Sequence, residues 1–152
     1  MAAVLNWKSF GNVYNDILVE QRSIDWFLLG YEEGSKNHIK LLKKGDGGLN
    51  AMKLNLNDIM VAFGYLKVYP RNDSKKDPET PIQPDFVHIT FIGKRVKAQE
   101  RARAVVHRLD IQQAFPRYII EFEASTVDEL DIDSIYDKID EMKALLATGF
   151  GG

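Results

Sequence analysis

The sequence predicts a mixed α/β fold in which one β-sheet is sandwiched between helices. Three observations support this class. First, some segments carry apolar residues at helical spacing. Second, other segments are short runs of large apolar side chains or alternate apolar and polar residues as strands do. Third, neighbouring predicted strands follow one another as hairpins. With 152 residues, of which 45% are hydrophobic and 28% are charged, the chain fits one globular domain with its own core.

The chain begins with a predicted helix followed by a hairpin. Asn6 or Ser9 caps the helix, which ends near residues 22–23. Its apolar side chains recur at i, i+3, i+4, i+7 and i+8 and are Phe10, Val13, Tyr14, Ile17 and Leu18. The short, bulky run at residues 26–31 predicts a buried strand, and residues 38–42 alternate as its hairpin partner.

A glycine-rich turn, Gly-Asp-Gly-Gly at residues 45–48, separates the hairpin from a short helix at residues 49–56. Such a turn before a helix is one way to bind phosphate. This one lacks the Lys-Ser/Thr pair of a phosphate-binding loop, and Asp46 would repel an anion. The favoured interpretation is a turn that needs positive φ.

The middle of the chain holds the strongest strand pattern, at residues 59–69. Its two faces consist of Val61, Phe63, Tyr65 and Lys67 on one side and Met60, Ala62, Leu66 and Val68 on the other. Residues 70–84 contain four of the five prolines, which predicts a loop because proline cannot donate to a sheet. Another strand follows at residues 86–92, rich in β-branched and aromatic residues.

The last third predicts a helix, a fifth strand and a final helix. The helix at residues 96–109 is amphipathic, and its expected buried stripe consists of Ala98, Ala102, Val105 and Leu109. Residues 118–124 alternate as a strand, and the final helix extends through Lys143. We expect a single domain at residues 1–147 followed by a flexible tail at residues 148–152.

Composition disfavours several classes of function. The chain has no cysteine, and its three histidines, His38, His88 and His107, lie in three different predicted elements, whereas a metal site needs several converging ligands. No catalytic motif occurs. We therefore expect no enzyme, no cofactor and no metal site. A net charge of −2 and short apolar runs predict neither a nucleic-acid partner nor a membrane partner.

Charge is distributed unevenly along the chain. Residues 71–108 hold nine basic and five acidic residues, whereas residues 109–152 hold three and ten. The basic residues in and just before the helix at 96–109 are Lys94, Arg95, Lys97, Arg101, Arg103 and Arg108. On a helical wheel Lys97, Arg101 and Arg108 lie beside the expected buried stripe, and Arg103 and His107 lie further toward solvent. This face is either a solubilising surface or a docking surface for an acidic partner, for which arginine is well suited.

Several segments, spread over nearly the whole chain, share the pattern of one known family. They are WFLLGYE at 26–32, GDGGL at 45–49, VAFGYLKV at 61–68, FVHITFIG at 86–93, ERAR at 100–103, YIIEFEAS at 118–125 and DEL at 128–130. Together they resemble the coactosin branch of the actin-depolymerising-factor homology (ADF-H) family. Each segment alone is mostly hydrophobic pattern, but their order and the Arg101-x-Arg103 pair make the combination specific.

The resemblance implies an ADF-H/gelsolin-like fold with a central mixed sheet of about five strands flanked by helices. It also implies actin binding without catalysis, and, as in coactosins, attachment to the side of filaments in preference to monomers. From it we expect a monomeric, cytoplasmic protein of the cytoskeleton.

The resemblance also implies site residues. Arg101 and Arg103 match the basic-x-basic pair with which the family's long helix contacts actin, and the surrounding basic residues named above are flanking candidates. A second, filament-side contact would come from the last helix, residues 128–143, and from the loop that carries Lys75 and Lys76.

The chain departs from the coactosin pattern in places. Asp85 stands where coactosins commonly have a basic residue, and the loop at residues 70–84 is long; either Lys75 and Lys76 replace the missing charge or filament affinity is reduced. Three alternatives stay open. One is a cofilin-like monomer-binding or severing factor. Another is an adaptor that binds another acidic protein or an anionic lipid headgroup through the same basic helix. The third, least favoured, is a catalytic domain that uses the acidic C-terminal residues or the glycine-rich turn.

Overall fold

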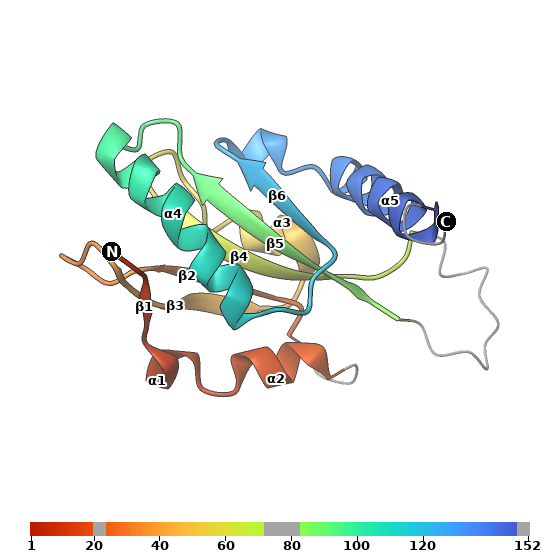
Figure 1. Ribbon diagram of the computed structural model, residues 1–152, viewed down its shortest axis with the longest axis horizontal. Helices are drawn as coiled ribbons and strands as arrows, with labels where there is room; N and C mark the ends of the chain where they lie inside the picture. Colours follow the sequence, from red (N-terminus) through yellow and green to blue (C-terminus); the bar gives the residue numbers. More distant parts are fainter. Residues whose placement is uncertain (20–23, 72–82, 149–152) are drawn as a thin grey trace.

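A six-stranded mixed sheet forms the centre of the part of the chain that the computed structural model describes, residues 1–19, 24–71 and 83–148 (Figure 1). The strands lie in the order β1-β3-β2-β4-β5-β6. They are β1 Val4–Leu5, β2 Trp26–Tyr31, β3 His38–Gly45, β4 Val61–Val68, β5 Asp85–Ile92 and β6 Ile120–Ala124. The predicted fold class is confirmed, with six strands in place of about five.

The sheet combines antiparallel hairpins with parallel edges. β2 pairs antiparallel with β3 and β4, and β4 with β5, whereas the edge strands β1 and β6 run parallel to β3 and β5. A parallel pair needs a crossover connection, which α4 supplies between β5 and β6. The helices are α1 Trp7–Phe10, α2 Val13–Leu18, α3 Gly48–Lys53, α4 Ala98–Ala114 and α5 Ile132–Thr148.

Helices cover both faces of the sheet. One core layer joins α1, α2 and α4 to the sheet and contains Phe63 and Tyr65 of β4. The other joins α3 and α5 to the opposite face and contains Ala62 and Leu66. The predicted alternation of β4 is thus confirmed, because neighbouring residues of one strand serve two different cores.

The described residues at the start of the chain, 1–19, differ from the prediction. Gly11, with φ of 56°, divides the expected helix into α1 and α2. Asn6 caps α1, since its Oδ1 accepts from the Ser9 N–H at 3.3 Å. The strand β1 was not predicted, because two residues are too few to form a pattern. The expected helix end near residues 22–23 lies outside the described residues.

The turn and the final helix follow the prediction more closely. Gly47 has φ of 87°, which confirms a turn that needs positive φ before α3. The last helix, α5, extends to Thr148, beyond the expected end at Lys143. Residues 149–152 of the predicted tail lie outside the described part of the chain.

The predicted orientation of α4 was wrong. Ala98, Ala102, Val105 and Leu109 face solvent, while the buried residues of the helix are Ala104, His107, Ile111 and Gln112. Helical spacing identifies a stripe but not which of two opposite stripes is buried. Here the sheet buries the more polar of the two stripes, and His107 on it finds hydrogen-bond partners inside the fold.

Candidate functional site

The outer face of α4 carries an exposed apolar strip. Val105, Val106 and Leu109 expose 43%, 58% and 54% of their surface, and Ala98 and Ala102 extend the strip toward the start of the helix. α4 lies on the outside of the sheet along most of its length (Figure 1). An apolar row on a solvent-facing helix is typical of an interaction surface when charged residues border it.

Arg101 and Arg103 border this strip on opposite sides. At about 100° per residue, two positions apart on a helix are about 160° apart around its axis. Arg101 is half-buried, and its Nη2 donates to the Gly93 carbonyl at 3.2 Å, at the junction between β5 and α4. Arg103, also half-buried, lies on the side of Tyr31 and lines a cavity there. Neither forms an ion pair within residues 1–19, 24–71 and 83–148.

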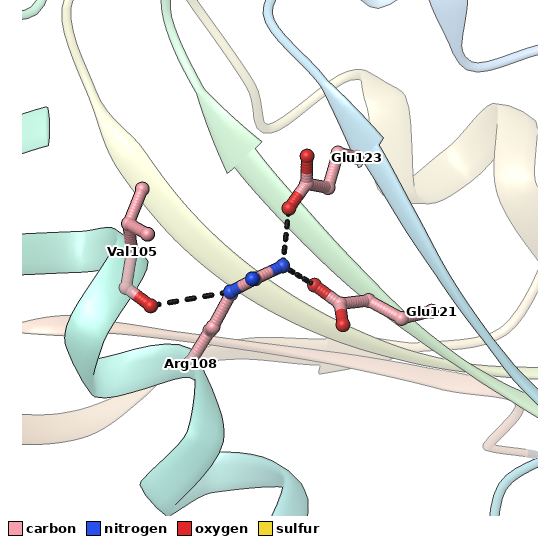
Figure 2. A network of polar contacts seen from close by, with 4 residues as sticks. All are labelled: Val105, Arg108, Glu121 and Glu123. Atoms are coloured by element: carbon pink, nitrogen blue, oxygen red, sulfur yellow. Dashed lines mark hydrogen bonds and ion pairs between the residues drawn. The ribbon is translucent and has the colours of Figure 1, made fainter.

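Arg108 has a different environment from the other two arginines. Its Nη1 contacts the carboxylates of both Glu121 and Glu123 on β6, and its Nε donates to the Val105 carbonyl at 3.2 Å (Figure 2). Its side chain is 27% exposed. The positive charge of Arg108 is therefore compensated inside the molecule, where it holds α4 against the edge strand.

The remaining basic candidates are divided between the described and undescribed parts of the chain. Lys94, Arg95 and Lys97 are exposed around the turn between β5 and α4, so they extend the positive charge at the start of the helix. Lys75 and Lys76 lie outside the described residues.

The surface where α5 meets the ends of β4 and β5 contains two ion pairs. Lys143 Nζ lies 2.8 Å from Asp85 Oδ2, and Arg71 Nη2 lies 3.3 Å from Asp137 Oδ1. Arg71 also lies over the ring of Tyr136, at 4.8 Å from its centroid. Asp85, the departure from the coactosin pattern, thus neutralises a basic residue of the last helix.

The three histidines lie apart, as their sequence positions predict. His38 is exposed. His88 is buried, and its Nε2 donates to the Phe115 carbonyl at 2.8 Å; burial lowers the pKa of His88. His107, expected toward solvent, is buried and contacts the Tyr31 hydroxyl through Nδ1 at 2.6 Å. The polar environment of His107 is built from distant segments, so no sequence pattern could have indicated it.

Two other classes of site are absent from the described residues. No group of three or more His, Asp or Glu side chains is arranged there to hold a metal ion. No helix among the described residues combines the length and apolar character that crossing a bilayer requires.

Comparisons with known proteins relate this chain to one group. The chain is 27% identical to drebrin-like protein A of Xenopus laevis over 134 residues, which is 88% of this chain but 28% of that protein. It is 29% identical to coactosin of Entamoeba histolytica over 105 residues, 68% of this chain and 66% of that protein. The chain thus spans less than a third of the length of the drebrin-like relatives.

Solved structures show the same fold. The crystal structure of Entamoeba histolytica coactosin superposes with a TM-score of 0.78 at 20% identity, covering 93% of this chain and 97% of that one. Mouse coactosin, described as an actin filament binding protein, gives a TM-score of 0.71 at 18% identity and covers 93% and 92% of the two chains. The pattern of the cofilin/tropomyosin-type actin-binding proteins matches residues 8–140, and the chain belongs to that family.

Proposed function

We propose that this protein binds the side of actin filaments through the outer face of α4, as a monomer, without cutting filaments and without catalysis. The observation that carries the proposal is the exposed apolar strip of α4 bordered by Arg101 and Arg103. Family membership and the likeness to coactosins support actin as the partner. On this proposal the protein acts in the cytoplasm, on the cytoskeleton.

The two kinds of surface on α4 contribute differently to binding. Val105, Val106 and Leu109 lose contact with water when a partner covers them, which stabilises a complex by about 25 cal/mol per Å² of apolar surface. The arginines pair with acidic residues of actin and set the register of the complex, and truncating one partner of a buried charge pair typically costs about 2–5 kcal/mol.

Arg101 is already ordered before binding. The hydrogen bond from its Nη2 to the Gly93 carbonyl holds the guanidinium in place and leaves its other N–H groups for a partner. A side chain that is ordered in the free protein loses less conformational entropy on binding. The strongest contribution to specificity is therefore expected at the Arg101 side of the strip.

Co-sedimentation with filamentous actin tests the proposed face. Arg101→Glu together with Arg103→Glu is expected to abolish pelleting with filaments, because both borders of the strip then repel an acidic partner. The matched control is Lys43→Glu with Lys44→Glu, two exposed lysines of β3 that change the net charge equally. The control should pellet like the wild type, and circular dichroism should show the same fold for all three proteins.

Two outcomes would contradict the proposal. Equal pelleting of the α4 variant and the β3 control would show that the contact lies elsewhere. Faster disassembly of pyrene-labelled filaments would favour the cofilin-like alternative over side binding. A salt series adds a further criterion: co-sedimentation should weaken as the salt concentration rises. Exposed charge pairs weaken because the Debye length falls from about 10 Å at 0.1 M toward 3 Å at 1 M.

A further inference from the structure

A cavity of about 390 Å³ lies beside α4, on the Arg103 side. It opens to solvent and is lined by the end of β2, the turn between β2 and β3, Leu42 of β3, the start of β4 and the first two turns of α4. Its volume falls in the range of ligand-binding pockets, about 300–1,000 Å³. Neither the sequence pattern nor the proposed contact of α4 accounts for it.

The walls of the cavity are apolar and held in place. They consist of Tyr31, Leu42, Met60 and Val61. Leu42 packs over Gly30. A Cβ on residue 30 would lie 2.5 Å from Leu42 Cδ1, so the absence of a side chain at Gly30 provides the space that Leu42 fills. The Tyr31 hydroxyl is fixed by its hydrogen bond to His107, and burial raises the pKa of Tyr31 to about 12, which keeps the phenol neutral.

The rim of the cavity carries charges of both signs. Arg103 and Lys36 are basic, and Glu32 and Glu100 are acidic. None of the four takes part in an ion pair with another described residue. A rim of balanced charge gives no net attraction for a phosphate or for an anionic lipid headgroup. It fits a peptide segment in which an apolar residue enters the cavity and charged neighbours lie on the rim.

Arg103 belongs to both the cavity and the border of the α4 strip. A partner that covers the strip therefore reaches the cavity mouth without a gap. We propose that the cavity receives one large apolar side chain of the same actin subunit that lies on α4. This inference rests on the proposed function and extends it, because it adds a concave contact in which this protein accepts a side chain of its partner.

Two leucine substitutions test the cavity with the same change in charge. Leu42→Lys places an ammonium group in the apolar wall, and Leu54→Lys places one at the end of α3, where Leu54 is 87% exposed and does not line the cavity. Leu42→Lys is expected to weaken binding to filaments at least about tenfold. Leu54→Lys should bind like the wild type, since an added positive charge by itself does not weaken attraction to an acidic partner.

The outcomes separate this inference from the proposed function. If the wild-type protein does not pellet with filaments, the proposed function fails. If the wild type pellets and the two lysine variants bind equally, the cavity inference is overturned while the α4 contact stands. If Leu42→Lys melts at a lower temperature than Leu54→Lys, the milder Leu42→Ala variant is used in its place. A folded Leu42→Ala protein that binds filaments at least about threefold more weakly than the wild type supports the cavity inference, and unchanged binding overturns that inference.

Discussion

At the scale of single residues, three arginines on one helix have different environments. Arg101 is held by a backbone carbonyl, Arg103 faces a cavity, and Arg108 is held by two carboxylates of β6. Their spacing on the helix does not distinguish them, because the groups that surround each one come from β5, β6 and the β2–β3 turn. A basic row on a helical wheel is therefore not a uniform binding surface.

Arg108 is expected to contribute more to stability than an exposed arginine. Replacing Arg108 by Ala removes the link between α4 and β6 and leaves Glu121 and Glu123 beside each other, which should lower the free energy of unfolding by about 1–2 kcal/mol. Arg71→Ala, which breaks a more exposed pair with Asp137, should cost less than about 1 kcal/mol. Urea unfolding of both variants measures the difference, and equal costs would contradict the assigned role.

His88 makes stability depend on pH. Burial lowers its pKa in the folded protein, whereas in the unfolded chain it takes up a proton near pH 6.5. Acidification through this range therefore favours the unfolded chain, and the free energy of unfolding should fall as pH decreases from about 7.5 to 5.5. His88→Gln should show a smaller decrease in denaturant unfolding over the same range. An unchanged decrease would assign the pH dependence to other groups.

At the scale of elements, the junction between β5 and α4 determines where the long helix begins. Gly93 follows β5 and lies against the segment between α3 and β4, where a Cβ on Gly93 would come within 2.1 Å of the Asp58 carbonyl oxygen. The Arg95 N–H also donates to that oxygen, at 2.9 Å. The glycine thus permits the close approach that sets the starting point of α4, and its own carbonyl holds Arg101.

Gly93→Ala should consequently destabilise the fold by about 3 kcal/mol, because the obstructing atom belongs to the backbone and cannot rotate away. Gly34→Ala is the control. Its φ of 76° is unfavourable for alanine, but no atom lies within 4 Å of the added Cβ, so a cost of about 1 kcal/mol is expected. Chemical denaturation of the two variants provides the measurement, and a Gly93→Ala protein as stable as Gly34→Ala would refute this account of the junction.

At the scale of the whole molecule, the sheet separates two surfaces of different character. α4 presents an apolar strip with basic borders on one side, while the acidic α5 covers the other and has its Lys143 paired with Asp85. Filament contact through α4 is consequently expected to be stronger than contact through α5. The Arg101→Glu and Arg103→Glu double variant leaves α5 unchanged, so any pelleting that it retains measures the contribution of surfaces other than the outer face of α4.

The elements were largely predictable from sequence, because each depends on local pattern. The alternation of residues 59–69 predicted both faces of β4, and the resemblance in residues 86–103 predicted the strand and the helix. The role of the Arg101–Arg103 pair stays a prediction. The orientation of α4 was not predictable in the same way. Burial of His107 depends on Tyr31 and on the Met1 carbonyl, which only the folded chain brings to the helix.

By itself the sequence determined the class of fold, the order of the main strands and helices and the family, since these follow from periodicity, turn residues and local motifs. Only the tertiary structure decided which side of α4 is exposed, that Arg108 is held by β6, and that a cavity lies beside Arg103. The physical reason is that burial, ion pairing and cavities depend on contacts between segments that are far apart in the chain. The periodicity of a helix or a strand carries no information about those contacts.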